Sequence, residues 1–299
     1  MTPDALASRL RHGLIPAVPV PFHGRAIAED AQRAYARWMA AQPVAGVAVW
    51  AHTGRGPHLS AEDRRLVLDT WRDALPDKLV VAGARDITMA IEARRGRADA
   101  ILAFPDRDDP VAYHRRLSRE LPVIAFLLYE AAGGVAYDDA TLDAILGLPA
   151  VIGIKVATLD SVMTFQRLAT VVQRHPGKLL ITGEDRFLGY SVMMGAEAAL
   201  VGMGAALPDL QAALLTAAGT ADWPRFVALS AICDRLAAAT FVEPMEGYVR
   251  RMLWAAAEDG ALSPDACDDP WGPALSADAL DREREIVRHA VRDARAAFA

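Results

Sequence analysis

This chain of 299 residues has few lysines and cysteines, no long apolar run and no excess of positive charge. Two cysteines, Cys233 and Cys267, form neither a metal-binding spacing nor a disulfide framework. A net charge of −6 argues against a nucleic-acid surface, which needs clustered basic residues. No apolar run reaches the roughly 18 residues of a membrane span, and "MTPDALASRLRHGL" lacks the apolar stretch of a signal peptide. We therefore expect a cytoplasmic protein with no nucleic-acid or membrane partner.

Eight short apolar segments recur along the chain and alternate with amphipathic stretches. They span residues 14–20, 46–50, 79–84, 100–105, 123–129, 151–156, 179–183 and 198–204. Apolar strands that alternate with helices are typical of a parallel sheet covered on both faces. Eight such units within about 210 residues favour an α/β fold of the (β/α)8 TIM-barrel type. A doubly wound open sheet is the alternative, but it usually has fewer strands, and no G-x-G-x-x-G follows an early strand here.

The apolar strands stop after residue 207, and four helical patterns follow. The first completes the barrel, and the other three predict a C-terminal helical extension. We place the barrel domain at residues 1–222 and the extension at 223–299. The segment after the third strand, "DITMAIEARRGR", is short for a full helix and is the weakest unit.

Only three of the 32 basic residues are lysines, and one of them, Lys155, lies within the apolar run "VIGIKVATLD". Burial disfavours the charged ammonium and lowers the pKa of a lysine by up to about 3–5 units. A neutral amine attacks carbonyl groups and forms Schiff bases. The alternative is a lysine that pairs with a carboxylate such as Glu130 or Glu184.

Two other strand ends carry groups suited to catalysis, because active sites of such barrels lie at the carboxyl ends of the strands. Tyr129 ends the fifth strand, next to the strand of Lys155, and its hydroxyl is placed to move protons. The alternative is a tyrosine that packs at the barrel rim. The loop "AHTGRG" offers backbone N–H groups and the Thr53 hydroxyl to an anion, or it is an ordinary tight turn.

Together these segments resemble the dihydrodipicolinate synthase and N-acetylneuraminate lyase family of Schiff-base aldolases. "GVAVWAHTGRGPHLSAEDR" is similar to the G-[ST]-T-G-E loop of the family, and "LPVIAFLLYE" to its tyrosine strand. "VIGIKVATLD" resembles its lysine strand, 26 residues further along, and "GAEAALVGMGAALP" its eighth strand. The opening "GLIPAVPVPFHGRAI" and the helical tail fit as well. The resemblance covers most of the chain.

The resemblance implies a role for several residues. Lys155 would form an imine with pyruvate or another 2-oxo acid, and Tyr129 would relay protons. Thr53 and the backbone N–H groups around Gly54 would bind the substrate carboxylate. Gly183 would leave room beside the lysine, and Leu200 would pack near the ketoacid. No metal and no cofactor is needed, and a homo-oligomer, a tetramer or a dimer, is expected.

The chain also departs from the family pattern. His52 replaces the first hydroxyl residue of the loop, and Arg55 replaces its glutamate; Glu130 follows the tyrosine. Gly134 takes the place of an arginine that binds the second substrate of the synthases. The relay tyrosine, which in the family acts across a subunit interface, is replaced within Pro105–Asp106–Arg107. Val156 takes the place of the acidic residue that follows the lysine.

These departures suggest substitutes for the missing groups. His52 is a candidate to take over proton transfer. A substrate carboxylate could be held by the two-pronged guanidinium of an arginine, and the candidates are Arg55, Arg85 and Arg107.

We expect a metal-independent Schiff-base lyase, which carries out aldol cleavage or condensation, or dehydration, of a 2-oxo acid. The altered loop and missing relay tyrosine leave a second hypothesis, a barrel that binds a 2-oxo acid as a sensor without turnover. A third hypothesis is a metal-dependent enzyme. The sequence argues against it, because the seven histidines form no close set of metal ligands.

Overall fold

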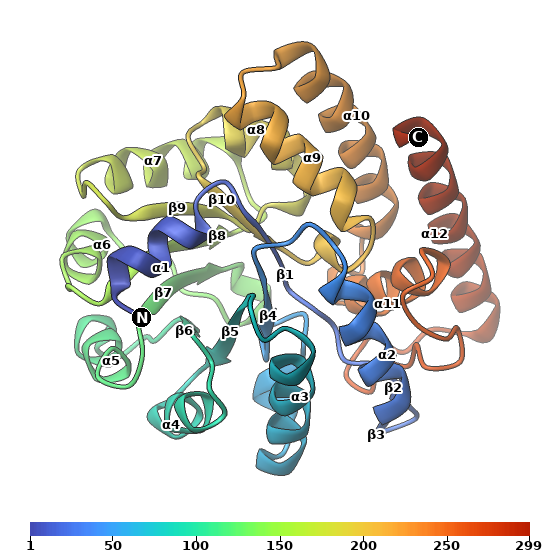
Figure 1. The fold of residues 1–299 in the computed structure, drawn as a ribbon, viewed down its shortest axis with the longest axis horizontal. Coiled ribbons are helices and arrows are strands. Elements are labelled where there is room, and N and C mark those ends of the chain that lie inside the picture. The colour runs from blue at the N-terminus through green and yellow to red at the C-terminus, as the bar shows by residue number, and fades with distance from the viewer.

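The computed structural model describes all 299 residues, and its centre is a barrel of eight parallel strands (Figure 1). The strands are β1 (Leu14–Pro16), β4 (Gly46–Val49), β5 (Leu79–Ala84), β6 (Ala100–Ala103), β7 (Val123–Leu128), β8 (Val151–Ala157), β9 (Leu179–Thr182) and β10 (Ala198–Val201). They pair in the order β1-β10-β9-β8-β7-β6-β5-β4. A bridge between Ala17 and Ala48 joins the two ends, so the barrel closes. The predicted TIM barrel and its eight strands are confirmed.

One helix follows each strand and covers the outside of the barrel (Figure 1). The helices are α2 (Glu29–Ala40), α3 (Ala61–Ala74), α4 (Ile87–Arg95), α5 (Pro110–Leu117), α6 (Asp139–Leu146), α7 (Val162–Gln173), α8 (Leu188–Met193) and α9 (Pro208–Gly219). Side-chain caps begin several of them, as when Ser60 accepts from the Asp63 N–H at 3.1 Å. The weakest predicted unit does form a helix, α4, which is capped by Asp86 and followed by Gly96.

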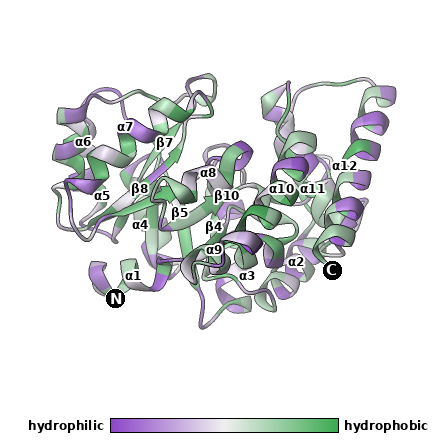
Figure 2. Cartoon of the chain, turned by 90° about the horizontal axis from the view of Figure 1, so that it is seen from above, coloured by the Kyte–Doolittle hydropathy of each residue, from purple (hydrophilic) through white to green (hydrophobic).

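The barrel has an inner cluster of 22 buried apolar residues and a larger outer cluster between strands and helices. Figure 2 shows the apolar strands and the hydrophilic outer faces of the helices. Helix α1 (Pro3–Leu10), which the sequence analysis did not predict, places Leu6 and Leu10 in the inner cluster. It therefore closes the amino-terminal end of the barrel, opposite the end where β7 and β8 present Tyr129 and Lys155.

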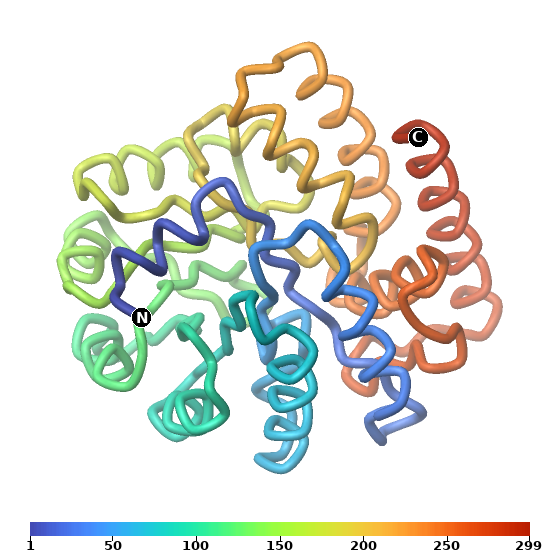
Figure 3. The backbone as a smooth tube through the Cα atoms, in the orientation of Figure 1, coloured from blue at the N-terminus to red at the C-terminus, as the bar shows by residue number.

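Three helices form the C-terminal extension: α10 (Trp223–Thr240), α11 (Tyr248–Glu258) and α12 (Ala277–Phe298). Helix α10 packs against α8 and α9, and α12 packs against α10 and α11. Figure 3 shows that the chain ends far from its amino terminus, on the outer side of this extension. The expected helical extension is present, and the boundary at residue 222 stays a prediction. None of the helices combines the length and apolar content needed to cross a membrane.

The link between α10 and α11 differs from the continuous helical pattern expected for "PMEGYVRRMLWAAAEDG". Pro244–Gly247 is not α-helical, and η5 (Met245–Gly247) is a single 3-10 turn. The guanidinium of Arg251, which is 1% exposed, donates to the carbonyl oxygens of Thr240, Val242 and Pro244. These bonds tie the last residue of α10 and the link that follows it to α11. The link therefore lies over the barrel, with Met245 against the inner cluster.

A second link, between α11 and α12, also returns to the barrel. Its residue Asp268 pairs with Phe22 of a short hairpin made of β2 (Phe22–His23) and β3 (Ala26–Ile27). Trp271 packs its ring against Phe22 and stacks on His58 at centroid distances of 5.5 Å and 5.4 Å. Both links of the extension thus reach loops next to the β4 end.

Candidate functional site

Lys155 lies on β8 with its side chain inside the barrel. Its neighbours Ile154 and Val156 pack into the outer cluster, as the two-residue period of a strand requires. The lysine is 5% exposed, and its Nζ lies 4.3 Å from the centroid of the Phe126 ring on β7. Lys155 is therefore an amine enclosed by an apolar lining.

Gly183, the residue after β9, gives the lysine its space. A Cβ built on Gly183 would lie 2.5 Å from Cε of Lys155 and 2.8 Å from Cβ of Ala157. Leu200 on β10 is fully buried and belongs to the same inner cluster as Ala157 and Tyr129. The structure thus puts Gly183 against the lysine and Leu200 in the lining of the barrel.

Burial lowers the pKa of Lys155 from 10.5 to about 8, and the negative charges of Asp185 and Glu184 oppose part of this change. At that pKa about one lysine in ten is a neutral amine at pH 7, against roughly one in a few thousand at the ordinary value. Lys155 therefore has the environment of a nucleophilic amine.

The two acids beside the lysine are themselves buried. Burial raises the pKa of Glu184 to about 7, although its carboxylate accepts hydrogen bonds from the N–H groups of Thr158 and Leu159. Burial likewise raises the pKa of Asp185 to about 7, and its carboxylate accepts from the Met203 N–H at 2.7 Å. Both carboxylates are thus bound by backbone groups and act on Lys155 through their charge.

Tyr129 joins a cluster of three polar side chains. Its hydroxyl donates to Oε1 of Glu246 and lies 3.1 Å from Nε2 of His52. The same histidine nitrogen lies 3.0 Å from Oε1 of Glu246. The structure therefore brings His52 and Tyr129 together and adds a carboxylate from the C-terminal extension.

Electrostatics fix where the charge lies in this cluster. Burial would raise the pKa of Glu246, but hydrogen bonds from His52, Tyr129 and Arg55 hold it well below its usual range. Burial, reinforced by the nearby Tyr248 and Glu246, raises the pKa of Tyr129 well above its usual range. Glu246 is accordingly a carboxylate, and Tyr129 keeps its phenolic proton.

Thr53 is buried beneath the extension. Its Oγ1 lies 3.0 Å from the hydroxyl of Tyr248, whose ring stacks on Phe241 at a centroid distance of 4.9 Å. A Cβ on the adjacent Gly54 would lie 3.0 Å from the carbonyl oxygen of Val18, so the loop passes close to the strand end. Thr53 and Gly54 are therefore held in a tightly packed loop at the same end of the barrel.

Arg55 is tied to the extension rather than open to solvent. It has a left-handed backbone, with φ of 52°, and is 3% exposed. Its guanidinium donates to both carboxylate oxygens of Asp269, at 3.1 Å and 2.7 Å, and to Oε2 of Glu246 at 2.8 Å. Burial would lower the pKa of Arg55, but these hydrogen bonds raise it overall. The fork expected to hold a substrate carboxylate is filled by two carboxylates of the chain itself.

Glu130 and Arg107, two further residues that the sequence suggested for the site, do not join the cluster. Glu130 is exposed at the rim, and Arg107 is exposed and donates to the carbonyl oxygen of Gly134 at 3.1 Å. The neighbouring Asp106 binds Tyr137 through its backbone N–H, at 2.8 Å. The loop after β6 is thus bonded to the loop after β7.

Three site residues escaped the sequence analysis: Glu246, Tyr248 and Asp269. All three belong to the extension, and Glu246 and Tyr248 lie in a stretch whose pattern predicts one helix. The only signal was Pro244 and Gly247, a pair that disfavours a continuous helix and marks the link that carries Glu246.

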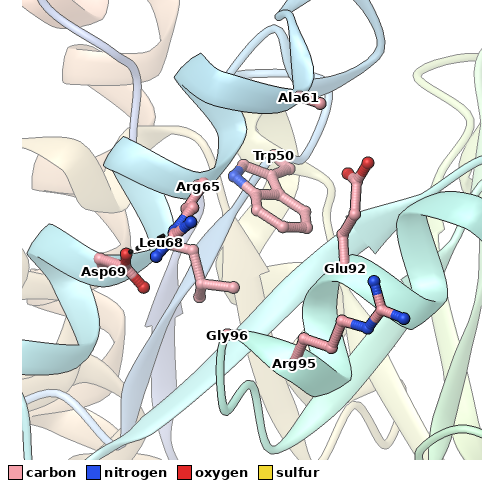
Figure 4. Close-up of a pocket in the computed structure, with 8 residues that line it drawn as sticks. All are labelled: Trp50, Ala61, Arg65, Leu68, Asp69, Glu92, Arg95 and Gly96. Atoms are coloured by element: carbon pink, nitrogen blue, oxygen red, sulfur yellow. Dashed lines mark hydrogen bonds and ion pairs between the residues drawn. The ribbon is translucent and has the colours of Figure 1, made fainter.

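A cavity of about 410 Å³ lies outside the barrel wall, between α3 and α4, and contains none of these side chains (Figure 4). It is lined by Trp50, Ala61, Arg65, Leu68, Asp69, Glu92, Arg95 and Gly96. Its two acids already pair with arginines: Glu92 with Arg64 at 2.7 Å, and Asp69 with Arg65 at 3.4 Å. No group of three or more His, Cys, Asp or Glu side chains is placed to hold a metal ion. Lys155, with its lowered pKa, and the hydrogen-bonded His52–Tyr129–Glu246 cluster make up the candidate site.

No profile of a known protein family matches the chain. A 4-hydroxy-tetrahydrodipicolinate synthase of Nitrobacter hamburgensis is 25% identical over 258 residues, which cover 80% of this chain and 85% of the relative. The sialic acid aldolase of Ruminococcus gnavus has a similar structure, with a TM-score of 0.82 and 18% identity over 97% of this chain and all of that chain. For the N-acetylneuraminate lyase of Mycoplasma synoviae the TM-score is 0.76 and the identity 17%, over 95% of this chain and 98% of that one. The two structural likenesses are likenesses of fold.

Proposed function

Because this chain is a divergent member of the dihydrodipicolinate synthase and N-acetylneuraminate lyase superfamily, we propose that it is a lyase that forms a Schiff base between Lys155 and a 2-oxo acid. The observation that carries the proposal is the lysine itself. Its amine is enclosed by the barrel lining, and its pKa is lowered to about 8. Burial and a lowered pKa are what activate a lysine toward carbonyl groups.

The imine forms in two balanced steps. The neutral amine of Lys155 attacks the C2 carbonyl. The carbonyl oxygen takes the Tyr129 proton, and the attacking nitrogen gives one proton back to the Tyr129 oxygen, so that a neutral carbinolamine forms. The hydroxyl then leaves as water after a second proton reaches it, and the nitrogen electron pair forms the C=N bond. Tyr129 is the proton donor of these steps, because it keeps its phenolic proton and lies at the end of the adjacent strand.

The Thr53 loop holds the substrate carboxylate. Its backbone N–H groups around Thr53 and Gly54 and the Thr53 hydroxyl are hydrogen-bond donors suited to an anion. Leu200 packs near the ketoacid, and Gly183 leaves room beside the imine. The protonated imine then serves as an electron sink, so that a C–C or C–H bond at C3 breaks and leaves an enamine.

Borohydride trapping tests the assignment. Incubation with pyruvate and borohydride, followed by intact-mass and peptide-mass measurement, should add one reduced pyruvate at Lys155. The variant Lys155→Met removes the amine, whereas Lys178→Met removes a lysine outside the barrel mouth and serves as the matched control. An adduct that persists in Lys155→Met, or no adduct in the unmodified protein, would falsify the proposal.

A further inference from the structure

Both carboxylate oxygens of Glu246 contact side chains of the barrel loops. Oε1 accepts from Tyr129 and lies within hydrogen-bond distance of His52, and Oε2 accepts from Arg55. Arg55 already has a bidentate partner in Asp269, which is itself buried. The arginine and Asp269 neutralise each other, so Glu246 adds a negative charge that this ion pair does not require.

That additional charge faces the two groups able to move protons. The Tyr129 O–H points at Glu246, so the lone pairs of the phenol oxygen are directed away from the carboxylate. His52 shares the same carboxylate oxygen through Nε2, at 3.0 Å. The phenol and the imidazole therefore meet at one carboxylate oxygen.

The cluster also connects a buried group with water. Tyr129 is 9% exposed, whereas the side chains of His52 and Glu246 are 14% and 35% exposed. All three belong to one chain, on β7, on the loop after β4 and on η5. A proton taken up by Tyr129 therefore has a path to solvent that needs no second subunit.

We propose that Glu246 is the positioning residue of an intrachain proton relay, in which Tyr129 exchanges protons with solvent through the Glu246–His52 pair. The inference rests on the proposed imine at Lys155. In the relay, a C3–H bond of the protonated imine breaks, and its electron pair forms the C2=C3 bond of the enamine. The C=N electrons return to nitrogen. The proton passes to the Tyr129 oxygen while the Tyr129 proton moves to the Glu246–His52 pair, which releases it to water.

Deuterium exchange into the methyl group of pyruvate tests the relay without knowledge of the second substrate. In D₂O the relay replaces the C3 protons with deuterium, and proton NMR measures the loss of the methyl signal. We expect Glu246→Gln to slow the exchange about 100-fold, the low end of the usual effect of general acid–base groups. Glu246→Asp should recover part of the rate, because it restores the charge.

The matched control is Glu243→Gln, which removes the charge of an exposed glutamate on the same link. It should exchange at the rate of the unmodified protein. The double variant His52→Gln/Glu246→Gln should lose no more than the slower single variant, because the two side chains act as one unit. Exchange by Glu246→Gln within about twofold of the unmodified rate, or losses that add in the double variant, overturns the relay.

Borohydride trapping separates this inference from the proposed function. If the relay is correct, Glu246→Gln still gives the full yield of reduced adduct at Lys155 after long incubation and loses only the exchange. Absence of the adduct from the unmodified protein refutes the imine itself. If Glu246→Gln gives no adduct while its thermal unfolding midpoint is unchanged, Glu246 is needed for imine formation. That result would overturn the proposal that Glu246 acts only in the proton relay.

Discussion

Gly183 and Lys155 lie so close that a Cβ on the glycine would be 2.5 Å from Cε of the lysine. We expect Gly183→Ala to displace the lysine side chain, because Val156 and Ala157 leave the new methyl group no other space. Trapping of pyruvate should slow at least about tenfold, and overpacking should lower the free energy of unfolding by about 1–3 kcal/mol. Urea unfolding and timed borohydride quenching measure the two effects.

Gly219→Ala is the control for that substitution. Nothing lies within 4 Å of a Cβ built on Gly219, which ends α9 with an ordinary negative φ. The free energy of unfolding of the Gly219→Ala variant should stay the same or rise slightly, because alanine favours a helix more than glycine does. A trapping rate in Gly183→Ala equal to that of Gly219→Ala would contradict the steric account of the site.

Imine formation should depend on pH through Lys155. Its pKa of about 8 in the folded protein means that the reactive neutral amine increases as the pH rises toward 8 and saturates above it. The initial trapping rate should therefore climb about tenfold per pH unit well below 8 and level off above about 9. Cyanoborohydride trapping from pH 6 to 10 measures the profile. An inflection near the ordinary lysine value of 10.5 would show that burial does not tune this amine.

Tyr129→Phe separates proton transfer from carbonyl attack. The variant keeps the ring and removes the hydroxyl that donates to Glu246. We expect C3 exchange to fall at least about 100-fold, while the final yield of trapped imine changes far less. NMR exchange and mass measurement on the same sample give both values. Equal losses in the two assays would remove the proton-transfer role from Tyr129.

Arg251 should be essential for the position of Glu246. Its buried guanidinium binds the Thr240 carbonyl at the end of α10, two carbonyl groups of the α10–α11 link, and Glu283 at 2.9 Å. Arg251→Met leaves these groups without a donor, so unfolding free energy should drop by about 3–5 kcal/mol. C3 exchange should also fall, since Glu246 loses its support.

The comparison variant is Arg282→Met, at an exposed position on α12. It should change the unfolding free energy by less than about 0.5 kcal/mol. Chemical denaturation of the two variants measures the difference. Similar stabilities would mean that the buried guanidinium does not hold the link.

Much of the barrel could be predicted from the sequence because its strands are buried on both faces. Each strand is therefore a short, nearly continuous apolar run, and Lys155 is conspicuous within one of them. The order of strands along the chain then places Lys155, Tyr129 and the Thr53 loop at one end. Helix α1 escaped prediction because it has only eight residues and its apolar face is small.

The extension could not be placed on the barrel in the same way. Helical periodicity predicts that α10 and α11 form and which faces they bury, but not how the link between them crosses the strand ends. His52 and Glu246 are 194 positions apart, and no local pattern connects them. Arg55 was expected to be free for a substrate because its partners come from the two unpredicted links of the extension, Glu246 from the α10–α11 link and Asp269 from the α11–α12 link.

The hydrogen-bonded set of Arg55, Glu246 and Asp269 has a consequence for how this sequence can diverge. Loss of the guanidinium alone leaves two buried or half-buried carboxylates facing each other, and loss of either acid leaves a buried cation with an unfilled donor. A single substitution at any of these positions therefore destabilises the site, and we expect substitutions at the three positions to occur together. In an alignment of related sequences, the residues at positions 55, 246 and 269 should covary, although more than 190 residues separate the first from the other two.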